Sequence, residues 1–330
     1  MDWGNILENG LRGFIGVDTI IYALAAIGLN VHFGYTGLLN FGQAAFLAVA
    51  AYGLAISVSI SGLPFGVGII AGLVGAVILA ILLGIPTLRL RADYLAIVTI
   101  AAAEIFRLIV RSASLRDQTG GSNGLTAFSD GFFSLNPLSK GQYGFGWFTY
   151  NERDSFVLIV GWVLIVLACT VVWLLMRSPW GRVIKAIRED EDAVRSLGKN
   201  VYAYKMQSLI LGGVLGSLGG FMLALGKGSV QPDLYGTELT FFAYTVLLLG
   251  GAARVLGPVI GSAVFWLILV LTDNILRSAI EAGYISSSII SDNQVGQIRF
   301  ILVGLALMLL MIFRPQGILG DRKELALDGR

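Results

Sequence analysis

The chain has 330 residues, of which 56% are hydrophobic and only 13% are charged. A soluble domain is about 25% charged, and a soluble protein of this length needs more polar surface to cover its core. This composition excludes a soluble enzyme and a disordered protein, and the net charge of +2 provides no basic stripe for nucleic acid. Long apolar runs with 43 glycines predict an all-α, polytopic transmembrane helical bundle rather than a β-barrel.

The apolar segments set the number of membrane spans, because a helix needs about 20 apolar residues to cross the hydrocarbon core. Several segments are short or are interrupted by glycine or proline, which predicts broken or re-entrant helices. We expect roughly eight to ten spans in a single transmembrane domain over residues 1–330. The candidate segments are 17–33, 39–59, 65–86, 93–110, 155–176, 206–226, 238–252, 257–273 and 297–313.

Lysine and arginine in the short loops predict the orientation of the spans. Basic residues gather in the segment 177–205, in the loop near 87–92 and in the tail after Phe313, so we expect these three regions on the cytoplasmic side. The stretch 112–154 has few basic residues and fits an outer loop. Counting back from the loop near 87–92 places the N-terminus outside, unless an early segment is re-entrant.

Catalytic and metal-binding patterns are missing from the sequence. It has one cysteine, Cys169, and one histidine, His32, which argues against a histidine-based metal or haem site. The glycine-rich stretch 119–124 lacks the lysine of a nucleotide-binding P-loop, and no metalloprotease or serine-hydrolase motif occurs. We therefore expect no enzyme activity in this chain and no cofactor.

A few polar residues occur within the apolar segments, where an unpartnered polar group is costly. Asn40 and Gln43 are three residues apart, so they share one helix face, and Gly42 between them permits close backbone approach. They fit either a solute path or interhelical hydrogen bonding. Glu104 and Arg107 also share a face, and they fit either a structural ion pair or the translocation path.

The segment 177–205 carries the clearest local signals for helix ends. Ser178 followed by Pro179 predicts a helix start, since serine caps a helix and proline suits its first turn. Glu191 and Arg195 form an i,i+4 pair, and Gly198 predicts the end of a helix. The sequence therefore predicts one or two short amphipathic helices between two spans.

These short helices have two interpretations. They could lie on the membrane surface, or they could dock on a cytoplasmic partner. The acidic run 189–192 would be repelled by anionic lipid, which favours docking.

Part of this segment resembles a known signature. Asp192-Ala193-Val194, followed after three intervening residues by Gly198, is similar to the loop by which the permeases of ABC importers insert into a groove of the ATPase subunit. The Ile-x-Leu-Pro that follows in that signature is absent here. Other stretches resemble the LivM-type permeases of branched-chain amino acid ABC importers. These stretches are 37–46, 87–97, 119–125, 178–182, 248–251 and 313–318, so the resemblance covers roughly residues 15–320.

The resemblance implies a permease subunit in the bacterial inner membrane that moves branched-chain or other neutral amino acids. Its implied partners are a second, LivH-like permease, two cytoplasmic ATPase subunits that hydrolyse ATP, a periplasmic or lipid-anchored substrate-binding protein, and membrane lipid. The outer loop 112–154 would contact the binding protein. The residues expected to couple to the ATPases are Trp180, Gly181, Arg182, Glu191, Asp192, Ala193, Arg195 and Gly198. The residues expected along the substrate path are Asn40, Gln43, Gly42 and Glu104.

Two alternatives stay open at this point. A urea or short-amide ABC permease of the same family would carry the same motifs. A secondary transporter driven by protons or sodium would need a buried ionisable relay, for which Glu104 and Asp273 are the candidates. The second alternative leaves the segment 177–205 without a role.

Overall fold

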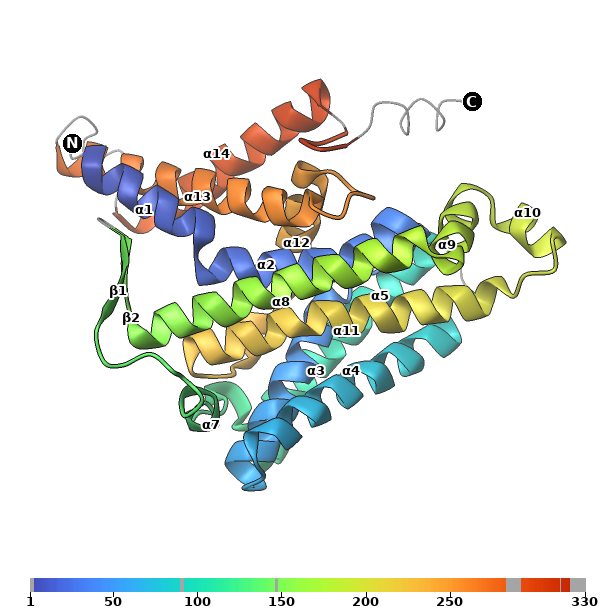
Figure 1. The fold of residues 1–330 in the computed structure, drawn as a ribbon, viewed down its shortest axis with the longest axis horizontal. Helices are drawn as coiled ribbons and strands as arrows, with labels where there is room; N and C mark the ends of the chain where they lie inside the picture. Colours follow the sequence, from blue (N-terminus) through green and yellow to red (C-terminus); the bar gives the residue numbers. More distant parts are fainter. Residues whose placement is uncertain (1–2, 90–91, 146–147, 283–291, 315, 321–330) are drawn as a thin grey trace.

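The computed structural model describes the chain as a helical bundle with two small elaborations, one at each end of its long helices (Figure 1). The described residues are 3–89, 92–145, 148–282, 292–314 and 316–320.

Within these residues, six helices are long and apolar enough to cross a membrane. Two of them are compound, because an α-helix runs directly into a wider π-helical segment. The six are Trp3–Tyr35 (α1 Trp3–Ile15, α2 Val17–Leu29 and the π-helix η1 Asn30–Tyr35), Gln43–Ile60 (α3 Gln43–Ala55 and the π-helix η2 Ile56–Ile60), α4 Phe65–Thr87, α8 Glu152–Arg177, α11 Val201–Lys227 and Gly257–Ile280 of α13 (Gly257–Glu281).

Three more helices coincide with the remaining apolar segments of the sequence: α5 Ala92–Arg111, α12 Thr237–Gly250 and α14 Asp292–Phe313. Most of each predicted apolar segment therefore lies on a helix, and the polytopic helical bundle is confirmed. Residues 37–42 are the main exception, because they form the turn between η1 and α3. Asn40 lies in this turn, so the prediction that Asn40 and Gln43 share one helix face is wrong. The sequence did not anticipate α1, which packs its Gly10 and Gly13 against Leu271 and Val270 of α13.

The two long loops fold into small elements at opposite ends of α8 (Figure 1). The stretch after α5 holds an antiparallel hairpin that leads into α8, whereas α8 continues at its other end into two short helices. The elements before α8 are η3 Ala113–Leu115, α6 Arg116–Thr119, η4 Gly121–Asn123, α7 Asp130–Phe133, β1 Gln142–Phe145 and β2 Phe148–Asn151. Those after it are α9 Pro179–Glu189 and α10 Glu191–Ser196, and η5 Pro232–Tyr235 joins α11 to α12.

The centre of the bundle is formed by α2, α3 and α11, which pack closely on one another. In the most apolar stretch of α11, 72% of the residues are buried. In that of α4 only 33% are buried, and large aliphatic side chains of α4 lie on the surface. Small residues permit this close packing. At Gly216 of α11 a Cβ atom would overlap the side-chain amide of Gln43 on α3, so a larger residue there requires this buried amide to move.

A Gly216→Ala substitution is expected to destabilise the bundle, because the added methyl group must displace the buried Gln43 amide. Overpacking of this kind costs about 1–3 kcal/mol. Thermal unfolding of the purified protein in detergent measures the effect. Gly66→Ala is the matched control, since nothing lies within 4 Å of the position that its Cβ would occupy. Equal unfolding temperatures for the two variants would contradict this account of the α3–α11 contact.

Candidate functional site

Three polar regions interrupt the apolar bundle: a cluster buried between α2, α3 and α11, a charged cluster at the end of α5, and the short helices α9 and α10. The buried polar cluster consists of His32, Thr36, Asn40, Gln43 and Ser208, all of them at most 2% exposed.

The amide of Asn40 links the two halves of the buried polar cluster. Its Nδ2 donates to Nδ1 of His32 at 3.1 Å and to Oε1 of Gln43 at 3.4 Å, and its Oδ1 accepts from the backbone N–H of Gly42 at 2.9 Å. Gln43 Nε2 in turn donates to the carbonyl of Ala25 at 3.4 Å. The amide of Asn40 is thus fully hydrogen-bonded to neighbouring groups of the protein, through both of its hydrogens and its oxygen.

His32 connects this network to α11. Its Nε2 lies 3.0 Å from the carbonyl oxygen of Leu209. Because a carbonyl only accepts, Nε2 carries the proton and Nδ1 is free to accept from Asn40. His32 is therefore a fully buried side chain whose two ring nitrogens are both hydrogen-bonded.

The geometry therefore favours interhelical hydrogen bonding for Asn40 and Gln43. Both side chains are fully buried within this one chain, and each is engaged by α2, α3 or α11. A direct contact between these amides and a solute stays a prediction from the sequence.

The charged cluster lies where α5 meets η5. Arg107 Nε donates to Glu104 at 2.9 Å, which is the ion pair that their spacing predicts. Arg107 and Arg111 both also reach Asp233 of η5, at 2.9 and 3.1 Å. The side chain of Asp233 is 60% exposed, so these pairs fix geometry more than they add stability.

A cavity of about 550 Å³ opens beside the charged cluster. Carboxylates, a guanidinium and a phenol face it together with apolar side chains. Its lining residues are Tyr22, Glu104, Arg107, Asp233, Leu234, Gly236, Thr237, Glu238, Leu239 and Phe242.

The helix α9 begins as its sequence predicts. Ser178 caps it by accepting from the backbone N–H of Gly181, and Pro179 occupies the first turn. Gly181 is buried at the junction with α8, while Arg182 is exposed. The indole N–H of Trp180 donates to Gln207 of α11 at 2.8 Å, which fastens the start of α9 to the bundle.

The helix α10 is capped by Asp190, whose carboxylate accepts from the backbone N–H of Ala193 at 2.9 Å. The predicted pair of Arg195 with Glu191 forms at 2.9 Å, and Arg195 also holds Asp192 at 2.8 Å. Residues 190–198 form the tip of this segment, and two of its residues are strongly exposed. The side chain of Asp192 is 88% exposed, and Leu197 is 79% exposed. The tip thus presents charges around one bare apolar side chain.

Gly198 ends this element. Its φ of +76° lies in the left-handed region that favours glycine, so the expected helix stop is confirmed two residues beyond Ser196, the last residue of α10.

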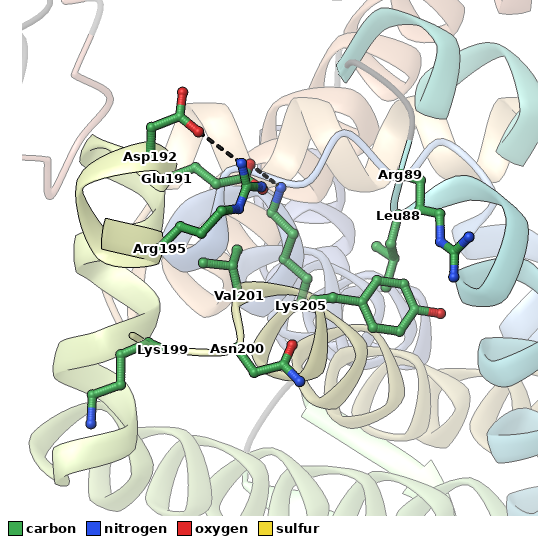
Figure 2. Close-up of a pocket in the computed structure, with 10 residues that line it drawn as sticks. Leu88, Arg89, Glu191, Asp192, Arg195, Lys199, Asn200, Val201 and Lys205 are labelled. Atoms are coloured by element: carbon green, nitrogen blue, oxygen red, sulfur yellow. Dashed lines mark hydrogen bonds and ion pairs between the residues drawn. The ribbon is translucent and has the colours of Figure 1, made fainter. Parts of the chain in front are cut away.

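A cavity of about 800 Å³ lies between α10, the start of α11 and the end of α4 (Figure 2). Glu191, Asp192, Arg195 and Lys205 gather on one side of it, with Arg89 opposite and Lys199 pointing away. Lys205 is an ion-pair partner of Glu191, so α10 is tied to α11 as well as to α9.

Sequence reasoning missed three of the residues that organise these regions. Asp233, Lys205 and Arg188 each pair with a group on another element, and their partners are 126, 14 and 154 residues away in the sequence. Helical spacing reveals pairs such as Glu104 with Arg107, but it gives no signal for contacts at these separations.

The fold and these regions define a multi-pass helical membrane protein with a short helical segment at one end of its bundle. Residues 12–313 match the family model described as "Branched-chain amino acid transport system / permease component". The chain belongs to this family, and it is therefore a transport permease.

Curated relatives agree with this assignment. The chain is 31% identical to the high-affinity branched-chain amino acid transport system permease protein LivM of Salmonella typhimurium, over 92% of this chain and 69% of that protein. It is 31% identical to LivM of Escherichia coli, over 93% and 70%. It is 24% identical to the probable LivM of Methanocaldococcus jannaschii, over 92% and 91%.

Removal of the Asn40 side-chain amide distinguishes a structural role from a solute contact. An Asn40→Ala variant leaves Nδ1 of His32 and the N–H of Gly42 without their partner, and a buried unsatisfied group costs about 1–3 kcal/mol. We expect a lower thermal unfolding temperature in detergent, whereas Asn123→Ala, at an exposed position of η4, should leave it unchanged. Unchanged stability of the Asn40 variant with lost solute uptake would instead favour the path.

Proposed function

We propose that this chain is the transmembrane permease subunit of a bacterial ABC importer in the inner membrane. Its solute is a branched-chain or another neutral amino acid, and ATP hydrolysis in separate subunits drives the transport. The observation that carries the proposal is the family match over residues 12–313, together with relatives named as branched-chain amino acid permeases. No step of ATP hydrolysis is assigned to this chain, because its sequence contains no P-loop motif.

The proposal places two cytoplasmic ATPase subunits on α9 and α10. These helices project from the end of the bundle, and their tip combines the exposed Asp192 and Arg195 with the exposed Leu197 (Figure 1). An apolar side chain ringed by charges suits insertion into a groove of a partner. The residues assigned to this contact are Trp180, Gly181, Arg182, Glu191, Asp192, Ala193, Arg195 and Gly198.

The other partners follow from the same assembly. A second, LivH-like permease completes the pore within the lipid bilayer, and a periplasmic or lipid-anchored binding protein delivers the solute. The hairpin β1–β2 and the short helices of the stretch 112–154 lie at the end of α8 opposite α9, where the binding protein would dock (Figure 1).

The substrate path is assigned to the cavity beside Glu104. A neutral amino acid carries one ammonium and one carboxylate. This cavity offers carboxylates that could bind the ammonium, Arg107 that could bind the carboxylate, and apolar side chains beside them. Asn40, Gln43 and Gly42 belong to the proposal as the groups that hold α2, α3 and α11 around the path.

Capture of the ATPases tests the assembly. The chain is co-expressed with candidate ATPase subunits and pulled down beside a variant with Glu191, Asp192 and Arg195 changed to Ala. We expect the variant to recover at least about tenfold less ATPase, since a contact worth roughly 1.4 kcal/mol or more is lost. The matched control changes Glu152, Arg153 and Asp154 to Ala, which removes the same three charge types at the opposite end of α8.

Two outcomes contradict this assignment. Equal recovery in both variants would place the contact elsewhere. If no ATPase comes down with the folded wild-type chain, the ion-coupled alternative gains support, and uptake driven by a proton or sodium gradient is then measured.

Uptake into proteoliposomes tests the solute and the path. With all partners present, we expect ATP-dependent uptake of leucine, isoleucine or valine and little uptake of urea or short amides. Glu104→Gln weakens the hold on Arg107 by about 1 kcal/mol, so uptake should fall roughly fivefold. Asp273→Asn, which breaks a comparable pair with Arg277, should leave uptake unchanged. A larger effect at Asp273 together with insensitivity to ATP would support the ion-coupled alternative.

A further inference from the structure

The cytoplasmic helix α9 makes one polar contact with the distorted end of the first span. Arg188 Nη1 donates to the carbonyl oxygen of Gly34 at 2.5 Å, and Arg188 is only partly exposed. One turn earlier on α9, Lys185 Nζ lies 5.7 Å from the centre of the buried Tyr35 ring. Two cations of α9 therefore face the last turn of η1.

The end of η1 has a backbone carbonyl that can accept a hydrogen bond from α9. Carbonyls in the last turn of a helix have no partner within the helix, so the Gly34 carbonyl is available to a donor from outside. The π-helical form is rare, and it often marks a functional position in a longer helix. The turn that follows η1 also lies close to Arg188, because a Cβ added at Gly37 would come within 3.4 Å of the Arg188 Cγ.

From η1, hydrogen bonds lead to three other parts of the bundle. Asn30 accepts from the N–H of Ala253 and donates to the carbonyl of Arg254, both at 2.8 Å, which ties η1 to the turn between α12 and α13. His32 reaches Leu209 of α11 and receives the amide of Asn40. A displacement of η1 therefore moves the buried polar cluster and the α12–α13 turn together.

The other polar links of α9 and α10 end nearer the cytoplasmic end of the bundle. Trp180 and Glu191 bind Gln207 and Lys205, which belong to the first two turns of α11. Ile184, which is fully buried, and Ile187 fix the apolar face of α9. Because this face is held by packing, α9 is expected to move as a rigid body with the groups that it contacts.

We propose that Arg188 is a positioning residue that transmits displacement of α9 to η1, and through η1 to the buried polar cluster. This inference rests on the proposed function, in which an ATPase subunit moves α9. Coupling between distant sites needs a connected set of groups that both sites bias, and Arg188 supplies the connection between the cytoplasmic helices and the interior of the bundle.

The test compares Arg188→Gln with wild type in the complete complex, reconstituted with its ATPases and binding protein. Glutamine keeps a polar side chain, but this side chain is shorter than that of arginine and carries no charge, so it does not reach the Gly34 carbonyl to donate a hydrogen bond. We expect the number of solute molecules imported per ATP hydrolysed to fall about tenfold, while capture of the ATPases stays within about twofold of wild type. Arg188→Lys, which retains a cationic donor, should recover part of the ratio. The control Lys199→Gln removes a charge from the same segment at an exposed side chain and should leave the ratio unchanged.

Hydrogen–deuterium exchange of the wild-type complex gives a reading that needs no variant. Switching between the nucleotide-free and the ATP-bound complex should change exchange in α9 and in residues 30–38 together. In Arg188→Gln the change in α9 should persist and that in 30–38 should be lost.

The outcomes separate this inference from the proposed function. If the wild-type chain captures no ATPase, the proposed function fails. If ATPases bind and hydrolyse ATP but Arg188→Gln imports as efficiently as the Lys199 control, the inference is overturned. It is also overturned if Arg188→Gln loses ATPase capture, or if nucleotide alters exchange in wild-type α9 without altering it in 30–38.

Discussion

The close approach of α2, α3 and α11 is the constraint on which the rest of the structure depends. Inside a bilayer no water satisfies a stray polar group, so every amide and imidazole in this region needs a protein partner. Asn40 and Gln43 find their partners on His32, Gly42 and Ala25, whereas His32 reaches the Leu209 carbonyl of α11. Gly212 and Gly216 of α11 leave the room that the His32 ring and the Gln43 amide occupy. Small residues thus act here as the condition for a buried polar cluster, and that cluster fixes the relative positions of three helices.

Much of the fold could be predicted because apolar runs and helix caps are local signals. Most of each apolar segment is helical, and Ser178, Pro179 and Gly198 mark the ends of the short helices as their residue types indicate. The amphipathic helix α1 was missed because only 13 residues form it and polar or small residues separate its exposed Trp3, Leu7 and Leu11, which lie four residues apart. Its packing on α13 is a tertiary contact, which no window of the sequence contains.

In the candidate sites, too, local contacts could be predicted from the sequence and tertiary contacts could not. The pairs Glu104–Arg107 and Glu191–Arg195 follow from helical spacing, and both are present. The groups that complete those sites, Asp233 and Lys205, come from elements that only the fold brings near. A sequence pattern therefore located where polar chemistry gathers, but it could not separate an amide that lines a path from one that joins two helices, since both uses need the same residue types.

The location of the polar contacts is relevant to how packed helices of this chain could move relative to one another. The apolar faces of α9 and of the central helices are buried tightly, and close-packed interiors shift between discrete arrangements rather than deform gradually. Apart from the buried polar cluster, several polar contacts between elements lie at the ends of helices, with Arg107 at the end of α5, Arg188 at η1, and Lys205 at the start of α11. Hydrogen bonds and ion pairs are directional, so they lose energy steeply when their geometry changes and can favour one arrangement over another. In the proposed function, switching of such a bundle would be confined to a few contacts at element ends, while helices with exposed apolar faces such as α4 need only remain apolar.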